Sequence, residues 1–430
     1  AKNFGEPWTD ARNGQVNTMV NVAHQLTDRW RVRTGFNFIR SETETNAAGF
    51  GFVPLAADGR TINRDNFTTD EFSRNYSSQN ELAGRVRTGR LDHQILMGAE
   101  VTRAQFNYTF RFRTLGSIDR VNPVYGALPG FPTFGFNDDS FSRQAGLYIQ
   151  DQITLPGGRS FLLLGGRGTF VDSTTRDAVT QVEKNSQNDK AFTPRVGWVY
   201  QVTPSTSSYV SLSDSFFPNY LSRSQSGAAF KPTRGRQYEV GVKQSLAGDR
   251  LLATFAYFDL TKQDVVVPDP DDFTFTFSVQ VGEERSRGVE AEVTGAVTAN
   301  WNVVATYTGM NAIVSEDPRA DFVGGRLAGA ARHSGSLYTR YSFSGTPLSG
   351  LSAGFGLYAA GRRFAALPNP TWVMPSYARV DADLRYDWAR WRFNLALKNL
   401  TNERYFELGG FNSMMPQPTR HAVASMHVLF

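Results

Sequence analysis

The segment ARVDADLRYDW, residues 378–388, alternates apolar and charged side chains without interruption. In an extended chain, Val380, Leu384 and Trp388 fall on one side, and Asp381 and Arg385 fall on the other. The pattern therefore predicts a β-strand with one apolar face and one charged face. Such a strand either packs its apolar face into a protein core, or turns that face to lipid in a membrane barrel and keeps its charges in a wet interior.

Comparable patterns recur along the chain, and none has a sustained helical period. Proline and glycine are frequent in the gaps between them. The pattern predicts seventeen strands, at 14–27, 30–41, 73–88, 91–112, 140–155, 160–173, 189–202, 206–217, 233–247, 250–267, 274–298, 301–314, 326–344, 349–363, 376–388, 391–404 and 420–430.

The connections between these strands alternate between two kinds. Eight are short, such as 26–29, 88–90 and the pair 389–390, and eight are mostly long. We expect the long ones near 42–72, 113–139, 174–188, 218–232, 268–273, 315–325, 364–375 and 405–419. A meander of hairpins with short turns on one side and long loops on the other is typical of outer-membrane barrels, and we expect one barrel domain over 1–430.

Aromatic residues support the membrane interpretation. Trp30, Trp301, Trp388 and Trp391 lie beside short turns and Trp198 lies close to one, as in an interfacial aromatic girdle. The alternative is that they belong to the core of a soluble β-protein. The last segment alternates as well and ends in Phe430, which resembles the closing strand of bacterial outer-membrane proteins.

Composition excludes several other classes of protein. With 40% hydrophobic residues and a mean hydropathy of −0.37, the chain has no run of about 18 apolar residues that could form a membrane helix. The net charge of +5 is scattered rather than clustered, so we expect no nucleic-acid partner. There is no cysteine, which excludes disulfides and thiolate sites. The first residues do not form a signal peptide.

Strand direction adds a constraint. The first and last predicted strands both run toward the side with the short turns, so they cannot close an all-antiparallel barrel. Single-chain bacterial barrels have even strand numbers. We therefore expect an odd number of strands to precede residue 1.

Five motifs in order resemble those of TonB-dependent outer-membrane receptors, most closely the ferrichrome-type receptors for hydroxamate siderophores. They are GLYIQDQITL (146–155), SFFPNY (215–220), GRQYEVGVK (235–243), RSRGVEAEV (285–293) and LKNLTNERYF (397–406). One departure is GGRGTFVD (165–172), where the family usually has an aromatic and an acidic residue directly after the Arg.

The resemblance implies a transmembrane antiparallel β-barrel of 22 strands, of which this chain holds about 17, in a bacterial outer membrane. The plug domain, the TonB-contacting segment and about five strands would then be absent from this sequence. The implied function is binding of a ferric siderophore and its import with energy from the TonB complex. The resemblance implies outer-membrane lipid and lipopolysaccharide as partners, and it leaves phage or bacteriocin open as further ones. Iron would enter only as part of the bound chelate, and no cofactor is implied.

The candidate ligand residues are aromatic side chains in the long loops. By the resemblance, Phe50 and Phe52 in GFGFV, Phe110 in NYTFRF and Phe411 in GGFNSMM match positions where the family has pocket residues. Their neighbours Phe112 and Tyr108 have weaker claims. Flat rings pack on the chelate while a few polar groups orient it. The alternative is that these rings pack loops together or belong to the outer girdle.

No catalytic or metal-binding pattern is present, so the sequence predicts no enzyme. The five histidines are scattered, and Asp381 and Asp383 are flanked by Arg379 and Arg385, which favours an ion-pair ladder over acid–base chemistry. Two other functions stay open at this point. One is a passive porin-like channel, and the other is a soluble or surface β-protein that binds another ligand.

Overall fold

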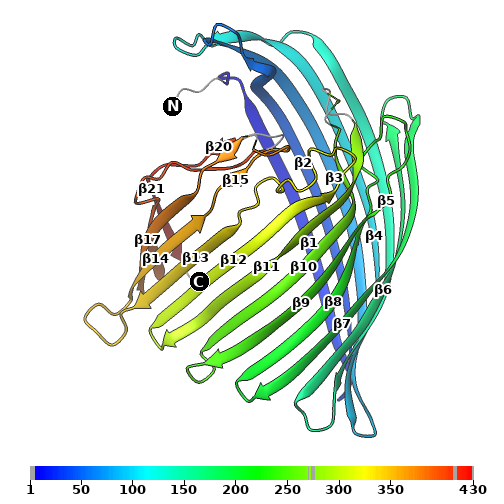
Figure 1. Ribbon diagram of the computed structural model, residues 1–430, viewed down its shortest axis with the longest axis vertical. Coiled ribbons are helices and arrows are strands. Elements are labelled where there is room, and N and C mark those ends of the chain that lie inside the picture. The colour runs from blue at the N-terminus through cyan, green and yellow to red at the C-terminus, as the bar shows by residue number, and fades with distance from the viewer. Residues whose placement is uncertain (1–4, 270, 273–276, 371, 410–413, 429–430) are drawn as a thin grey trace.

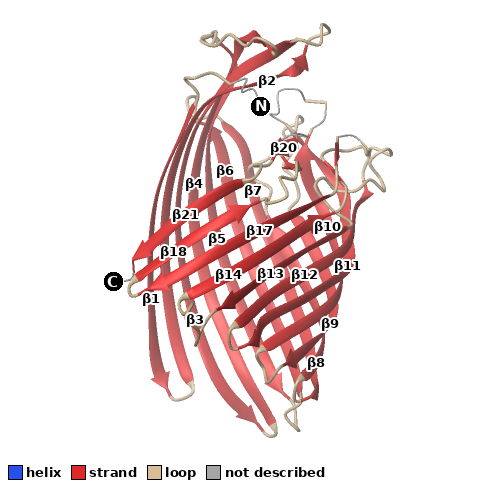
Figure 2. Cartoon of the chain, turned by 90° about the vertical axis from the view of Figure 1, so that its left-hand side faces the viewer, coloured by secondary structure: helices blue, strands red, loops and turns tan. Residues whose placement is uncertain are grey.

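The computed structural model describes residues 5–269, 271–272, 277–370, 372–409 and 414–428. Strands and their connections account for all of this described part (Figure 2). No helix within it is long and apolar enough to cross a membrane.

Seventeen strands form one large antiparallel sheet, which confirms the predicted strand number. The first nine are β1 (Asp10–Thr27), β2 (Trp30–Leu55), β3 (Thr61–Thr88), β4 (Leu91–Asp119), β5 (Pro132–Thr154), β6 (Ser160–Asp177), β7 (Glu183–Thr203), β8 (Thr206–Phe217) and β9 (Thr233–Leu246). The other eight are β10 (Leu251–Pro268), β11 (Ser278–Thr298), β12 (Trp301–Glu316), β13 (His333–Ser342), β14 (Leu351–Ala360), β17 (Tyr377–Trp388), β18 (Trp391–Lys398) and β21 (His421–Val428).

Two small hairpins are inserted in the connections of this sheet. One pairs β15 (Arg363–Phe364) with β16 (Val373–Met374), and the other pairs β19 (Phe406–Leu408) with β20 (Met414–Pro416). Because β14 pairs directly with β17, and β18 with β21, the insertions leave the meander uninterrupted.

The connections alternate as the sequence indicates. Short turns such as 28–29, 89–90 and 389–390 gather at one end of the sheet, here called the turn end. The longer connections gather at the opposite end, here called the loop end, where they include 120–131 and 218–232. Figure 1 shows the two ends at the bottom and the top of the view.

The sheet curls strongly but does not close (Figures 1 and 2). Among the described strands, β1 pairs with β2 alone and β21 with β18 alone. In a meander of seventeen antiparallel strands the first and last run in the same direction, so these two edges cannot pair as antiparallel neighbours.

The loop end differs from expectation in one respect. Residues 42–72, expected as a loop, instead continue β2 and β3 as a paired ladder that leaves a connection of only 56–60. Likewise β4 and β5 extend into the expected loop 113–139. The physical reason is that the buried face of these extensions is partly polar: Arg64 and Asn66 are buried on it together with Ile62. The apolar alternation that marks the strands elsewhere is therefore lost while the backbone pairing continues.

The two faces of the sheet differ in exposure and in chemistry. In β5, Leu147 and Ile149 are 63% and 55% exposed, whereas their neighbours Gly146 and Tyr148 on the other face are buried or half-buried. In β17, Leu384 is 49% exposed and Asp381 only 4%. Side chains splay apart on the convex face of a curled sheet and crowd on its concave face. The apolar side chains therefore line the convex outer face, and the charged ones line the concave inner face.

Tryptophans mark the turn end of the outer face. Trp30, Trp301 and Trp391 each begin a strand after a short turn, and Trp388 lies directly opposite Trp391. Trp30 lies flat over Gly84 of the neighbouring strand, where an added Cβ would overlap its ring. This arrangement agrees with the expected interfacial girdle. Phe430, the expected terminal aromatic, lies outside the described residues.

The contact between Trp30 and Gly84 makes a first prediction. Replacing Gly84 with Ala should lower the free energy of unfolding by about 1–3 kcal/mol, because the new methyl group displaces the indole ring. Denaturant unfolding of the protein in detergent measures this. Gly168→Ala is the matched control, since a Cβ there meets nothing within 4 Å. Equal stability of the two variants would contradict the proposed packing.

Candidate functional site

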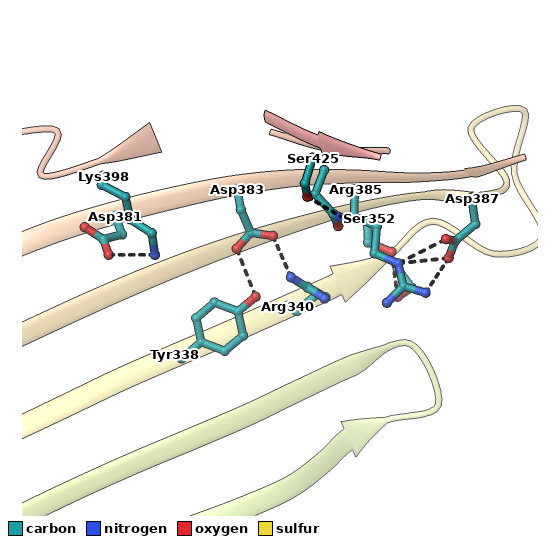
Figure 3. A network of polar contacts seen from close by, with 11 residues as sticks. Tyr338, Arg340, Ser352, Asp381, Asp383, Arg385, Asp387, Lys398 and Ser425 are labelled. Atoms are coloured by element: carbon teal, nitrogen blue, oxygen red, sulfur yellow. Dashed lines mark hydrogen bonds and ion pairs between the residues drawn. The ribbon is translucent and has the colours of Figure 1, made fainter. Parts of the chain in front are cut away.

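A ladder of ion pairs runs along the inner face of β13, β17 and β18 (Figure 3). The carboxylate of Asp383 accepts hydrogen bonds from Tyr338 Oη at 2.9 Å and from Arg340 Nη2 at 2.6 Å. Asp381 Oδ2 accepts from Lys398 Nζ at 3.1 Å. Lys398 lies on the adjacent strand β18, whereas Tyr338 and Arg340 reach Asp383 from β13 across the intervening strand β14. Because each of these charges has a partner, the arrangement indicates a structural ladder rather than acid–base chemistry.

Above the sheet, the long hairpins at the loop end are fixed by a buried ion pair. The side chains of Glu6 and Arg64 are 0% and 1% exposed, and Arg64 Nη1 lies 2.7 Å from Glu6 Oε1. Glu6 Oε2 also accepts from the backbone N–H of Gly126 at 2.6 Å, and Trp8 Nε1 donates to Ala127 O at 2.9 Å. Burial by itself raises the pKa of Glu6, but the Gly126 N–H and Arg64 together hold it below its ordinary value.

The tip of the β2–β3 hairpin is held by a carboxylate. Asp58 accepts from Thr61 Oγ1 at 2.6 Å and from the backbone N–H groups of Thr61 and Arg60, both at 2.8 Å. The hydrogen bonds from Thr61 lower the pKa of Asp58 from 3.8 to about 2. Because the pKa of Asp58 is lowered in the folded protein, its ionised form stabilises the turn above about pH 4. This stabilisation is lost as the pH falls toward 2.

An aromatic cluster lies on the extended parts of β4 and β5. The ring centroid of Phe136 is 5.6 Å from that of Tyr108 and 5.6 Å from that of Phe110. Phe134 lies 6.3 Å from Phe110 and 6.1 Å from Phe136. These four residues are here called the β4–β5 aromatic cluster. Separations of this size are typical of interacting aromatic pairs.

Register places this cluster on the inner face. In β4, Glu100 forms an inner-face ion pair with Arg167, and the pairing with β5 runs without a bulge from there to Phe112. Since side chains alternate, Tyr108 and Phe110 lie on the same face as Glu100. The cluster therefore faces the concavity at the loop end. Burial and the charge of Glu71 raise the pKa of Tyr108, so its hydroxyl stays protonated and can donate a hydrogen bond.

Charged groups border the cluster. Asp138 follows Phe136 by two residues on the same face, and Lys184 contacts both Asp138 and Asp177. Arg223 Nη1 lies 3.6 Å from Asp138 Oδ2. The resulting surface combines apolar rings with a charged border, which can bind a bulky amphipathic ligand and orient it.

The structure describes the six expected ligand residues unequally. Tyr108 and Phe110 lie in the cluster, and Phe112 lies on the same face directly opposite Phe134. Phe50 and Phe52 belong to β2, but their side chains lie outside what is described. Phe411 lies outside the described residues altogether. None of these facts tests ligand binding, so all six stay predictions.

Phe134 and Phe136 were missed by the analysis of the sequence, because the segment 113–139 was interpreted as a loop. A signal was present: the two rings are separated by a single glycine, as in a strand with one aromatic face. A glycine is required at position 135 because the backbone of β4 approaches it closely: a Cβ there would lie 2.8 Å from Phe110 O.

Among the described residues, no group of three or more His, Asp or Glu is placed to hold a metal ion. Several charged groups at the loop end form pairs with one another, as Glu6 does with Arg64 and Lys184 with Asp138. The arrangement therefore supports binding and orientation of a ligand by packing and hydrogen bonding.

A meandering sheet with an apolar outer face and an ion-paired inner face defines a membrane protein of the β-barrel class. The family model described as TonB dependent receptor-like, beta-barrel matches residues 2–400. The chain therefore belongs to the TonB-dependent receptor family. This assignment confirms the expected fold family and outer-membrane location, and it places the chain with receptors rather than enzymes.

Two curated relatives are 31% identical to the chain. One is the ferrichrome outer membrane transporter/phage receptor of Escherichia coli K12, with 85% of this chain and 51% of that protein aligned. The other is the metal-pseudopaline receptor CntO of Pseudomonas aeruginosa, with 94% and 58% aligned. The chain thus spans between half and three-fifths of the length of these relatives.

Solved structures agree on the fold. The ferric-catecholate import receptor Fiu of E. coli K12 superposes with a TM-score of 0.83 over 99% of this chain and 65% of that one. At 19% identity this likeness concerns the fold alone.

The ion-pair ladder makes a second prediction. Asp383→Ala should lower the free energy of unfolding by roughly 1–3 kcal/mol, because it leaves Tyr338 and Arg340 half-buried without their acceptor. Denaturant unfolding compares it with Asp10→Ala, whose partner Arg12 is 77% exposed. That control should change stability by less than about 0.5 kcal/mol. A loss no larger for Asp383 than for Asp10 would show that the ladder does not stabilise the sheet.

Proposed function

We propose that this chain is the barrel portion of an outer-membrane receptor that binds a ferric siderophore and imports it with energy supplied through TonB. The observation that carries the proposal is the β4–β5 aromatic cluster, which faces the concavity of a sheet with a lipid-type outer face. A ligand captured there would already lie at the entrance to the polar interior.

The proposed ligand surface comprises Tyr108, Phe110, Phe112, Phe50, Phe52 and Phe411. The relatives bind different chelates by name: ferrichrome in one case, metal-pseudopaline in another, and ferrioxamine B in a third of 26% identity. Phenylalanine at 50 and 52 provides packing without hydroxyl donors. Tyr108, with its protonated hydroxyl, is therefore the proposed source of a directional hydrogen bond within an otherwise apolar contact.

Active import requires more than this chain contains. The proposal places its seventeen strands in a barrel of 22, with a plug and a TonB-contacting segment contributed by residues outside the sequence. The odd number of strands and the parallel directions of β1 and β21 support an odd complement of further strands. Accordingly, residues 1–430 alone should not accumulate ferric chelate in a TonB-dependent way.

Other ligands could use the same loops. A solved structure with a TM-score of 0.79 is a complex of the receptor FpvAI with pyocin S2, and the E. coli relative is named a phage receptor. For this chain we propose only that its loop end can also bind a bacteriocin or a phage. A passive channel is disfavoured by the same family membership.

The aromatic cluster makes a third prediction. Phe110→Ala should raise the Kd for a ferric hydroxamate chelate about tenfold, because it removes one of the packed rings. Binding is measured with the full-length receptor that contains this chain, purified from the outer membrane, using a ⁵⁵Fe-labelled chelate, and its import is measured in cells with and without TonB.

Phe192→Ala is the control, because this ring is 66% exposed on the outer face and away from the cluster. An unchanged Kd for the Phe110 variant would refute the assignment of the cluster as the ligand surface. Import that continues at full rate without TonB would refute the proposed energy coupling instead.

A further inference from the structure

Two carboxylates of β3 share the face of the sheet that holds the β4–β5 aromatic cluster. The pairing of β3 with β4 runs without a bulge from Arg64 to Thr88, and it places Glu71 directly opposite Tyr108. Directly paired residues of adjacent strands lie on the same face, with Cβ atoms about 5 Å apart. Since side chains alternate along a strand, Asp65 lies on this face as well.

Charge is divided between the two faces of β2 to β5 at the loop end. Strand register assigns the faces over the paired segments 39–49, 65–75, 104–114 and 134–142. In these segments the charged residues on the face of the cluster are all acidic, namely Asp65, Glu71 and Asp138. The basic residues of the same segments are all on the opposite face, namely Arg40, Arg74, Arg111 and Arg113.

Two of the three acidic side chains lack a counter-charge. Asp138 is compensated by Lys184 and Arg223. Within the described part of the chain, Glu71 and Asp65 take part in no ion pair and in no side-chain hydrogen bond. Burial raises the pKa of Asp65, and no basic group lies close enough to oppose this effect. The face of the cluster therefore has two carboxylates whose charge the protein does not compensate.

The aromatic rings next to Glu71 have free faces. Aromatic rings attract cations that lie over them within about 6 Å. On the opposite side of the sheet the ring of Phe72 has such a partner, since the guanidinium of Arg74 lies 5.1 Å from its centroid. Among the described residues no cation lies over Phe106 or Tyr108. These two rings are nearly parallel, with centroids 6.0 Å apart, and form one aromatic surface beside Glu71.

We propose that the ferric chelate bound by this chain carries a free alkylammonium group, which Glu71 binds against the rings of Phe106 and Tyr108. This inference rests on the proposed function and adds the charge of the substrate to it. A carboxylate beside an aromatic face provides both an ion pair and attraction by the ring quadrupole, and together these replace the hydration of an ammonium group. The body of the chelate packs on the remaining rings of the cluster.

Chelates of other charge fit this surface less well. An anionic chelate would be repelled by Glu71 and Asp65. A neutral chelate would displace water from Glu71 without supplying a compensating charge. Asp65 precedes Glu71 by six residues, about 20 Å of strand, toward the tip of the β2–β3 hairpin. Its charge therefore attracts a cationic chelate before the chelate reaches Glu71.

The test compares two linear ferric trihydroxamates that differ only at one end, where one has a free amine and the other has the same amine acetylated. Binding of each ⁵⁵Fe-labelled chelate is measured with the full-length receptor that contains this chain, purified from the outer membrane. The wild-type receptor should bind the amine chelate on the order of tenfold more tightly, because acetylation removes one charge-assisted contact. This comparison needs no variant protein.

Two variants of equal shape and charge change then locate the contact. Glu71→Gln should bind the amine chelate as weakly as the wild-type receptor binds the acetylated one, and its affinity for the acetylated chelate should not change. Glu44→Gln is the matched control. Thr43 is the β2 residue paired with Glu71, so Glu44 lies on the opposite face, where it is exposed. The control should keep the full preference for the amine chelate.

The possible outcomes separate this inference from the proposed function. Equal binding of the two chelates by the wild-type receptor would overturn the inference and leave the proposed function standing. A preference that survives in Glu71→Gln, or that is lost equally in Glu44→Gln, would overturn the assignment of the ammonium contact to Glu71. Binding of neither chelate would refute the proposed function, and the inference with it.

Discussion

Backbone hydrogen bonding between adjacent strands is the constraint on which the other features of this molecule depend. In hydrocarbon, an unpaired N–H or C=O group has no water to satisfy it, so a strand can cross a membrane only beside paired neighbours. The uninterrupted meander from β1 to β21 meets this condition for every strand between its two edges. Because the backbone is satisfied within the sheet, the side chains of each face are free to match different surroundings.

The side chains of the two faces differ in their chemistry. On the inner face, charges such as Asp381 and Asp383 are compensated by basic groups one or two strands away, and this arrangement keeps a polar interior stable. On the outer face, exposed apolar side chains extend from the girdle at the turn end to Phe36 and Phe170. The same ladders continue beyond the membrane, where they place the β4–β5 aromatic cluster on a rigid support.

Sequence patterns were sufficient for the meander and its polarity, because lipid on one side and water on the other impose alternation residue by residue. In the segment 378–388, Leu384 is exposed on the outer face and Asp381 is buried on the inner face, as the alternation predicts. Alternation fails where the covered face contains polar groups such as Arg64 and Asn66, and the sequence therefore predicts shorter strands than the β2 to β5 of the structure. The candidate site was recovered in part for the same reason: Tyr108 and Phe110 end a recognisable strand, whereas Phe134 and Phe136 lie in a stretch without alternation.

The anchoring of residues 5–9 has a consequence for the speed of capture. Glu6 and Trp8 hold the connection between β4 and β5 in one shape before any ligand arrives. The conformational entropy of that connection is therefore lost during folding and not during association. Under the proposed function, a chelate that reaches the concavity would meet an already ordered β4–β5 connection, so that encounter and orientation, rather than ordering of this connection, would set the association rate.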